Sequence, residues 1–227
     1  MNKIFCLNKE EDVKNIQTNQ IKELVGLDGV ALVEDGDGVK DRLLAAIDEV
    51  EEKYILFVPH NNILVSEIDP SRMEAIKKIA EKHDLDYVRL RRISLKENGP
   101  VIEGDVRTSR ENIFFLVPYL LKKEVFRSIV ERTSVRPVNF FFLSFETTGF
   151  NGGYYYNKDD QGNKKLSYFK SRVVDTISDP LVTPNNNWSL ALIENNESIL
   201  SSLLDKWEID VNIRGVQGQK GCCNDMG

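Results

Sequence analysis

Asp35 and Asp37, separated by one glycine, are the residues of this 227-residue chain whose spacing suggests chemistry most directly. Two carboxylates placed in this way can hold Mg²⁺ or Mn²⁺ against a diphosphate, because these hard cations prefer oxygen ligands and keep phosphate oxygens as co-ligands. The alternative is a strand-to-helix turn in which Asp37 only caps the next helix. Such a short pattern occurs often by chance, so the residues alone favour the cap.

His60, Asn61 and Asn62 form a second polar group, which directly follows an apolar run and Pro59. The histidine can act as an acid or a base near neutral pH, and all three side chains can hydrogen-bond a phosphate or a sugar hydroxyl. The alternative is a strand-end turn whose asparagines bond their own backbone. The residues favour neither interpretation over the other.

Five arginines make the middle of this acidic chain locally basic: Arg89, Arg91, Arg92, Arg107 and Arg110. A guanidinium can bind phosphate through two parallel hydrogen bonds, so such a group can neutralise a diphosphate. Alternation along a strand more often means a solvated face, and that is the role expected of any single arginine.

A predicted alternation of strands and helices in the first ninety residues positions these groups. The run Tyr54–Val58 is typical of a strand buried on both faces, and Pro59 ends it because proline has no N–H to donate. We therefore predict an α/β fold with a Rossmann-type, mostly parallel sheet flanked by helices, whose carboxyl edge binds the ligand. Further strands are expected at Lys3–Leu7, 29–33 and 87–90, and helices at about 9–24, 39–53 and 70–83.

Asp69 and Pro70 are a clear helix start, with the aspartate as N-cap and the proline in the first turn. The second half of the chain is expected to be mixed. No linker or repeat is visible, so we predict one domain over residues 1–216 and a disordered tail at 217–227. The elements expected here are a strand at 112–117, a helix at 122–132, a strand or buried helix at 138–145, a loop or hairpin at 150–165 and a helix at 198–207.

Composition excludes several classes of protein. The net charge of −6 argues against non-specific nucleic-acid binding. Cys6, Cys222 and Cys223 make neither a disulfide framework nor a zinc site. No apolar run has transmembrane length, and no signal peptide is evident. We therefore expect a reduced, cytoplasmic, globular protein; its oligomeric state is not indicated.

Several stretches, in their order and spacing, resemble a family of small GT-A-like glycosyltransferases found in bacterial surface-polysaccharide clusters and large DNA viruses. The family has an Arg-Leu-Leu-x-Ala-Leu helix that enters a central strand, and Asp41-Arg-Leu-Leu-Ala-Ala-Ile47 entering Tyr54–Val58 is similar to it. The resemblance covers roughly residues 40–216. The other similar stretches are 69–90, 112–126, 171–188 and 203–215.

The resemblance implies a GT-A fold, a nucleotide-sugar donor, and Mn²⁺ or Mg²⁺ held by an acidic pair after the central strand. His60 and Asn61 stand in the place of that pair, so the family's metal site looks lost, because neutral ligands attract these cations far less than carboxylates do. Three explanations stay open. The enzyme is metal-independent, or Asp35 and Asp37 hold the metal, or the protein is a non-catalytic relative.

We predict a glycosyltransferase that moves a sugar from a nucleotide-sugar donor to a hydroxyl of a saccharide or glycan acceptor. Glu146 falls where the family carries an acidic residue, and it is the predicted base that deprotonates the acceptor. The alternative is a pseudo-glycosyltransferase that binds carbohydrate or a protein partner without catalysis. The predicted substrate-binding residues are Asp35, Asp37, His60, Asn61, Asn62 and Arg91.

Overall fold

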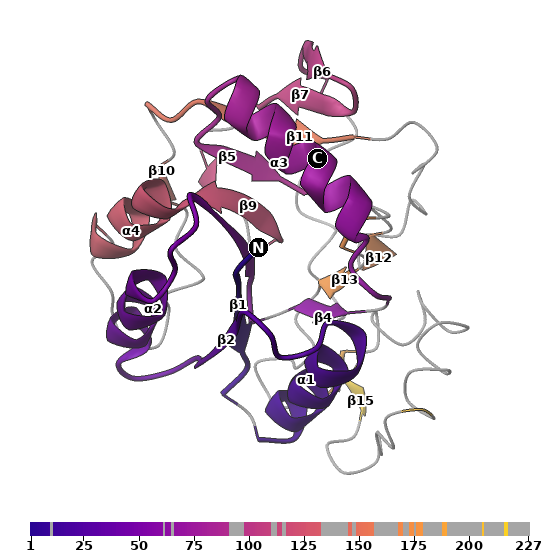
Figure 1. Ribbon diagram of the computed structural model, residues 1–227. Coiled ribbons are helices and arrows are strands. Elements are labelled where there is room, and N and C mark those ends of the chain that lie inside the picture. The colour runs from indigo at the N-terminus through magenta and orange to yellow at the C-terminus, as the bar shows by residue number, and fades with distance from the viewer. Residues whose placement is uncertain are drawn as a thin grey trace, which may run out of the picture.

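A computed structural model of the chain gives its architecture. In the part of the chain that it describes, four helices and an eight-stranded mixed sheet form the main body (Figure 1). The residues that the structure describes are 1–9, 11–60, 62–64, 66–90, 98–109, 113–114, 117–132, 145–146, 149–156, 168–169, 173–174, 176–178, 188–189, 206 and 216–217.

The central strand of the main sheet is β3, as the sequence predicted. All five residues of β3 are buried, and it pairs with β1 on one side and β9 on the other. The prediction of a strand buried on both faces at Tyr54–Val58 is therefore confirmed. In spatial order the strands are β2 (Val30–Glu34), β1 (Lys3–Leu7), β3 (Tyr54–Val58), β9 (Tyr119–Lys122), β5 (Tyr87–Arg89), β11 (Gly152–Tyr155), β7 (Val106–Thr108) and β6 (Val101–Glu103).

The strand directions make this sheet mixed. β1 pairs in parallel with β2 and β3, and β5 pairs in parallel with β11. The four pairings that involve β9 or β7 are antiparallel. The Rossmann-type, mostly parallel character of the prediction is therefore not confirmed, although a mixed sheet with helices on both faces is compatible with a GT-A-like fold.

Two helices cover each face of the sheet (Figure 1): α1 and α3 lie on one side, and α2 and α4 on the other. The start of α3 is as predicted. The Asp69 side chain accepts hydrogen bonds from the backbone N–H groups of Ser71 and Arg72, and Pro70 opens the helix. No helix in the described ranges has the length and apolar character needed to span a bilayer. The helices are α1 (Glu11–Leu24), α2 (Val39–Asp48), α3 (Pro70–Lys82) and α4 (Lys123–Arg132).

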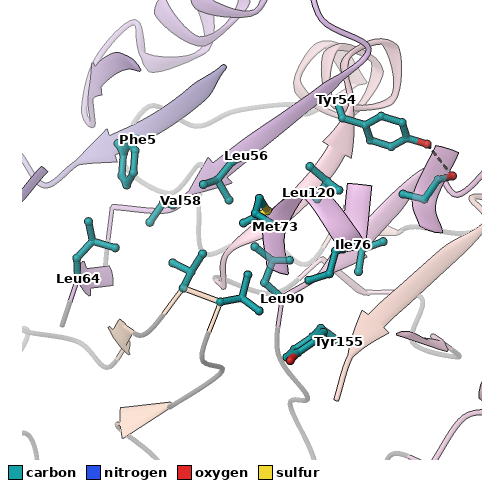
Figure 2. Close-up of a cluster of buried hydrophobic side chains, with 14 of the residues drawn as sticks. Phe5, Tyr54, Leu56, Val58, Leu64, Met73, Ile76, Leu90, Leu120 and Tyr155 are labelled. Atoms are coloured by element: carbon teal, nitrogen blue, oxygen red, sulfur yellow. Dashed lines mark hydrogen bonds between the residues drawn. The ribbon is translucent and has the colours of Figure 1, made fainter. Parts of the chain in front are cut away.

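Alternating side chains of β3 enter two separate cores, because successive residues of a strand point to opposite faces. Leu56 and Val58 contribute to the cluster under α1 and α3, together with Met73 and Ile76 of α3 (Figure 2). Phe57 belongs to the cluster under α2 and α4. Burial of each side chain of this size stabilises the fold by about 1.5–3 kcal/mol. The two cores thus hold β3, and with it the residues that follow β3, in a defined position.

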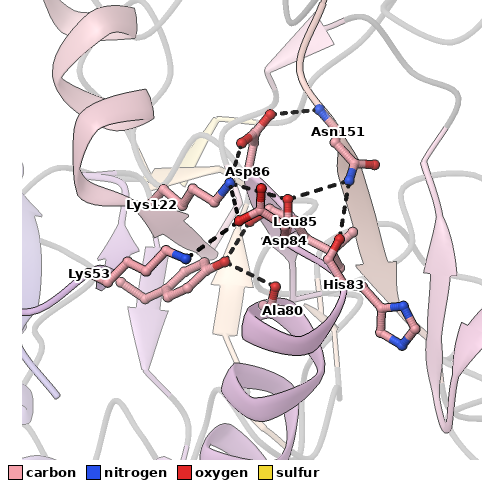
Figure 3. A network of polar contacts seen from close by, with 9 residues as sticks. Lys53, Ala80, His83, Asp84, Leu85, Asp86, Lys122 and Asn151 are labelled. Atoms are coloured by element: carbon pink, nitrogen blue, oxygen red, sulfur yellow. Dashed lines mark hydrogen bonds and ion pairs between the residues drawn. The ribbon is translucent and has the colours of Figure 1, made fainter.

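A network of charged side chains lies at the amino edge of the sheet (Figure 3). Nζ of Lys122 lies 2.7 Å from Oδ1 of Asp86 and 3.0 Å from Oδ1 of Asp84. The second carboxylate oxygen of Asp86 accepts a hydrogen bond from the backbone N–H of Asn151 at 2.8 Å. Burial opposes the charge of Lys122, but the hydrogen bonds to Asp86 and Asp84 outweigh it and raise the pKa of the lysine. The network ties β9, β5 and β11 together.

The second half of the chain corrects two predictions. Tyr119–Lys122, for which no strand was expected, is β9, the strand that separates β3 from β5. Residues 150–165 were predicted as a loop or hairpin, but they contain β11, whose partners are the distant strands β5 and β7. Both corrections concern strands that pair only with segments far away in the sequence.

Shorter strands form three small sheets in the described part of the chain. Most of the segments predicted at 138–145 and 198–207, and all of the predicted tail except residue 217, lie outside the described residues. In one of the small sheets, β13 (Thr176–Ser178) lies between β12 (Tyr168–Phe169) and β4 (Asn62–Leu64). The other two small sheets are β10 (Phe145–Glu146) with β8 (Ile113–Phe114), and β14 (Trp188–Ser189) with β15 (Val216–Gln217).

Candidate functional site

The carboxyl edge of the main sheet brings three strand ends together. β1, β2 and β3 are parallel neighbours, so the residues that follow them reach the same edge. The backbone N–H of Asp35 donates to the carbonyl of Leu7 at 2.9 Å, which continues the pairing of β1 and β2 into the turn. The parallel arrangement thus places Asp35, which follows β2, near His60, which follows β3.

Asp35 and His60 approach each other at this edge. Nε2 of His60 lies 3.9 Å from Oδ2 of Asp35, and His60 is only 7% exposed. Burial lowers the pKa of His60, because a charged ring would lose its hydration, and the Asp35 carboxylate partly opposes that shift. At neutral pH the ring is therefore neutral. It can donate one hydrogen bond and accept one, but it brings no positive charge to a ligand.

The turn that carries His60 is held by its own backbone and by Asn62. The backbone N–H of Asn62 donates to the carbonyl of Pro59 at 3.1 Å, and Nδ2 of Asn62 donates to the same oxygen at 3.3 Å. Asn62 is 4% exposed and begins β4. Its amide nitrogen thus bonds the turn's backbone, as the alternative interpretation of the sequence expected. Its role in substrate binding stays a prediction.

The turn after β2 gives Asp35 and Asp37 different surroundings. Asp37 is exposed, whereas the side chain of Asp35 is 19% exposed. Gly38, with a φ of 73°, is the N-cap of α2, so the alternative in which Asp37 caps the helix is wrong. The guanidinium of Arg42 shapes the turn by donating to the carbonyls of Glu34 and Asp37, both at 2.7 Å. Of the two aspartates, only Asp35 faces the histidine.

The side chains at this edge do not fit the divalent metal that the resemblance implies. Within the described ranges, no three His, Cys, Asp or Glu side chains lie close enough together to hold a metal ion. A neutral imidazole and one half-buried carboxylate attract Mg²⁺ or Mn²⁺ less than two carboxylates would. Cys6 adds no ligand, because burial and, to a lesser extent, Asp35 raise the pKa of its thiol.

Arg89 and Arg107 show how two of the arginines are placed. The Arg89 guanidinium lies 5.5 Å from the ring centre of Tyr154, and that of Arg107 lies 5.2 Å from the ring centre of Tyr156. Such cation–π contacts stabilise by about 0.5–2 kcal/mol, depending on their desolvation. Arg89 is 1% exposed at the end of β5, so the expectation of a solvated face is wrong for this residue.

The roles of all seven predicted site residues stay predictions, and for three of them the structure describes no side chain. Asn61 and Arg91 lie outside the described residues. Of Glu146 only the backbone is described; it is the second residue of β10 and pairs with Ile113 of β8, in a sheet separate from the main one.

Gln17 of α1 is a candidate that sequence reasoning did not single out. It is 3% exposed, and its amide bonds the backbone at Asn8, His60 and Asn62. A polar residue four positions after Val13, on the helix face that also carries Ile16 and Ile21, is the signal that would have identified it.

No family model and no curated protein matches this chain. Among solved structures, A197 from STIV is 14% identical over 79% of this chain and 94% of that protein, with a TM-score of 0.38. A mutant of the Drosophila β1,4-galactosyltransferase 7, in complex with manganese, UDP-Gal and xylobiose, is 11% identical over 79% of this chain and 93% of that one, with a TM-score of 0.28. At such low scores, neither likeness carries an argument about the function of this chain.

Proposed function

We propose that this protein is a glycosyltransferase that binds a nucleotide-sugar donor at the carboxyl edge of β1, β2 and β3, without a metal ion. The observation that carries the proposal is the approach of Asp35 and His60 to 3.9 Å at a sheet edge of the kind where open α/β folds bind ligands. The sequence resemblance supplies the reaction class. The mixed sheet, with helices on both faces, is compatible with the GT-A-like fold that the resemblance implies.

In this proposal, the Asp35 carboxylate accepts hydrogen bonds from hydroxyl groups of the nucleotide sugar. The neutral His60 ring forms one further hydrogen bond with an oxygen atom of the same nucleotide sugar. Hydrogen bonds to a carboxylate are stronger than those between neutral groups, and burial strengthens them further. A neutral histidine does not offset the charge of a diphosphate. That task falls to cationic side chains of the arginine group, among which Arg91 is the predicted member.

In the transfer step, the acceptor hydroxyl attacks the anomeric carbon of the donor. The bond between that carbon and the diphosphate oxygen breaks, and the nucleoside diphosphate leaves with the electron pair. The hydroxyl proton passes to Glu146, the predicted base.

A non-catalytic binding module is the second candidate. It is favoured by the side chains themselves, because neutral His60 stands where the resembled family has an acidic pair. Such a protein would bind a carbohydrate or a partner and would not turn over a donor.

Calorimetric titration with a panel of nucleotides and nucleotide sugars, in Mn²⁺ and in EDTA, tests the donor site. Asp35→Asn and His60→Gln should each weaken binding about tenfold, because each removes a hydrogen-bonding group from a largely buried site. Asp28→Asn, an exposed aspartate in the turn before β2, is the matched control and should bind as the wild type does. Binding that is lost in EDTA would contradict the metal-free site, and no binding of any donor would refute the glycosyltransferase.

Release of nucleoside diphosphate in the presence of an acceptor panel separates the enzyme from the binding module. Glu146→Gln should abolish this release and leave the donor affinity unchanged. Tight donor binding by the wild type, with no release for any acceptor, would favour the module.

A further inference from the structure

The amide of Gln17 joins two of the three strand ends at the carboxyl edge. Its Oε1 accepts a hydrogen bond from the backbone N–H of Asn8, directly after β1, at 2.8 Å. Its Nε2 donates to the carbonyl of His60 at 2.7 Å and to that of Asn62 at 3.1 Å. One side chain from α1 therefore bonds both the end of β1 and the turn after β3.

These bonds fix the turn through its backbone. His60 and Asn62 are two residues apart, and their carbonyls are both directed at the same amide nitrogen. Gln17 is 3% exposed, so water cannot readily replace it as a donor. Buried carbonyls that lose their donor are costly, and a turn left with such carbonyls would move to recover hydrogen bonds.

We infer that Gln17 is a positioning residue of the proposed donor site, which holds the turn at the height and angle that direct the His60 ring toward Asp35. Its effect on ligand binding rests on the proposed function, but its effect on the His60 ring does not. Gln17 touches no reacting atom in this assignment. It acts through the His60 backbone.

Gln20 provides a matched control on the same helix. It lies one turn further along α1 and is 1% exposed, against 3% for Gln17, so both side chains are buried. Neither atom of its amide has a hydrogen-bond partner among the residues that the structure describes. Replacing either glutamine by methionine therefore makes the same small change in side-chain volume and removes the same amide group. Only at Gln17 does the change also remove hydrogen bonds.

The test uses ¹⁵N-histidine labelling of the full chain, which contains only two histidines, His60 and His83. His60→Gln assigns the two ring signals. In Gln17→Met the ring signals of His60 should shift, and the pH at the midpoint of its titration should rise toward the value of about 6.5 for a solvated histidine. In Gln20→Met the ring signals of His60 and the midpoint of its titration should equal those of the wild type. His83, whose ring lies 2.7 Å from the Glu103 carboxylate, should be unchanged in both variants.

Unchanged His60 signals and an unchanged midpoint in Gln17→Met would overturn the assignment. So would an equal change in Gln20→Met, because that would indicate a general effect of substitutions in α1. If Gln17→Met does not fold, Gln17→Glu gives the same readout, since it keeps the acceptor for Asn8 and loses the donor to the two carbonyls.

Nucleotide titration of the same variants separates the two proposals. Gln17→Met should weaken donor binding about tenfold, and Gln20→Met should leave it unchanged. If the wild type binds no nucleotide, the proposed function fails, and the His60 signals still decide the role of Gln17. If the wild type binds and Gln17→Met binds equally well with unshifted His60 signals, the positioning role fails alone.

Discussion

The amino and carboxyl edges of the main sheet both carry polar side chains, and they arrange them differently. At the amino edge, Lys122 contacts the carboxylates of Asp84 and Asp86, so charges of opposite sign are paired within the chain (Figure 3). At the carboxyl edge, the His60 ring and the Asp35 carboxylate are 3.9 Å apart, beyond hydrogen-bond distance. Burial keeps that ring neutral.

The difference indicates which edge serves the fold and which is suited to a ligand. Paired charges in a network hold three strands together, and removal of one member leaves the others without compensation. Two polar groups at 3.9 Å leave room for an oxygen atom to bridge them. Substitutions in the amino-edge network should therefore lower stability without changing ligand binding. Substitutions of Asp35 or His60 should weaken ligand binding and change stability little at neutral pH.

Lys122→Met should have the largest effect on stability. The free energy of unfolding should fall by about 2 kcal/mol, less than for a fully buried pair, because Asp84 and Asp86 stay partly exposed. Urea denaturation measures this change. Lys53→Met removes an exposed lysine 3.4 Å from the same Asp84 and should cost much less, because water screens an ion pair between two exposed side chains. Equal losses for the two variants would show that the hydrogen bonds and ion pairs of Lys122 do not stabilise the fold.

Tyr54→Phe should destabilise the same edge by about 1 kcal/mol. The Tyr54 hydroxyl lies 2.7 Å from the carbonyl of Leu85 and 3.0 Å from that of Ala80, and the change leaves both oxygens without this donor. Burial raises the pKa of Tyr54 to about 12, so the hydroxyl remains a donor throughout the accessible pH range. Urea denaturation at neutral pH is the measurement. A variant as stable as the wild type would contradict the proposed cost of the lost hydrogen bond.

His60→Gln should have the smallest effect on stability, visible only in its pH dependence. Because burial lowers the pKa of His60 in the folded chain, the unfolded chain binds a proton below about pH 6.5 that the folded chain does not. Wild-type stability should therefore fall as the pH decreases below that value. The variant should lose less, by up to about 1 kcal/mol between pH 6.5 and 5.5. Identical pH profiles would show that His60 is not held neutral.

Elements whose own residues carry a strong local signal were predictable. Five apolar residues predicted the buried strand Tyr54–Val58, and Asp69 predicted the start of α3, because burial and capping depend on neighbouring residues. The missed strands have no such signal. β11 begins with Gly152 and Gly153, which are typical of a loop, yet a Cβ on Gly152 would lie 2.0 Å from the ring of Tyr87. That glycine serves close packing between strands, which only the fold creates.

For the candidate site, too, the locally marked features were predictable from the sequence and the long-range contacts were not. The sequence by itself determined that Asp35 follows one strand and His60 another, because strand ends are marked locally by glycine, proline and polar residues. Only the tertiary structure decided that these strands both flank β1, that Asp35 faces the histidine while Asp37 faces solvent, and that Gln17 holds the turn. The physical reason is that sheet order and register arise from pairings between residues far apart in the chain, and no local pattern encodes which strand ends become neighbours.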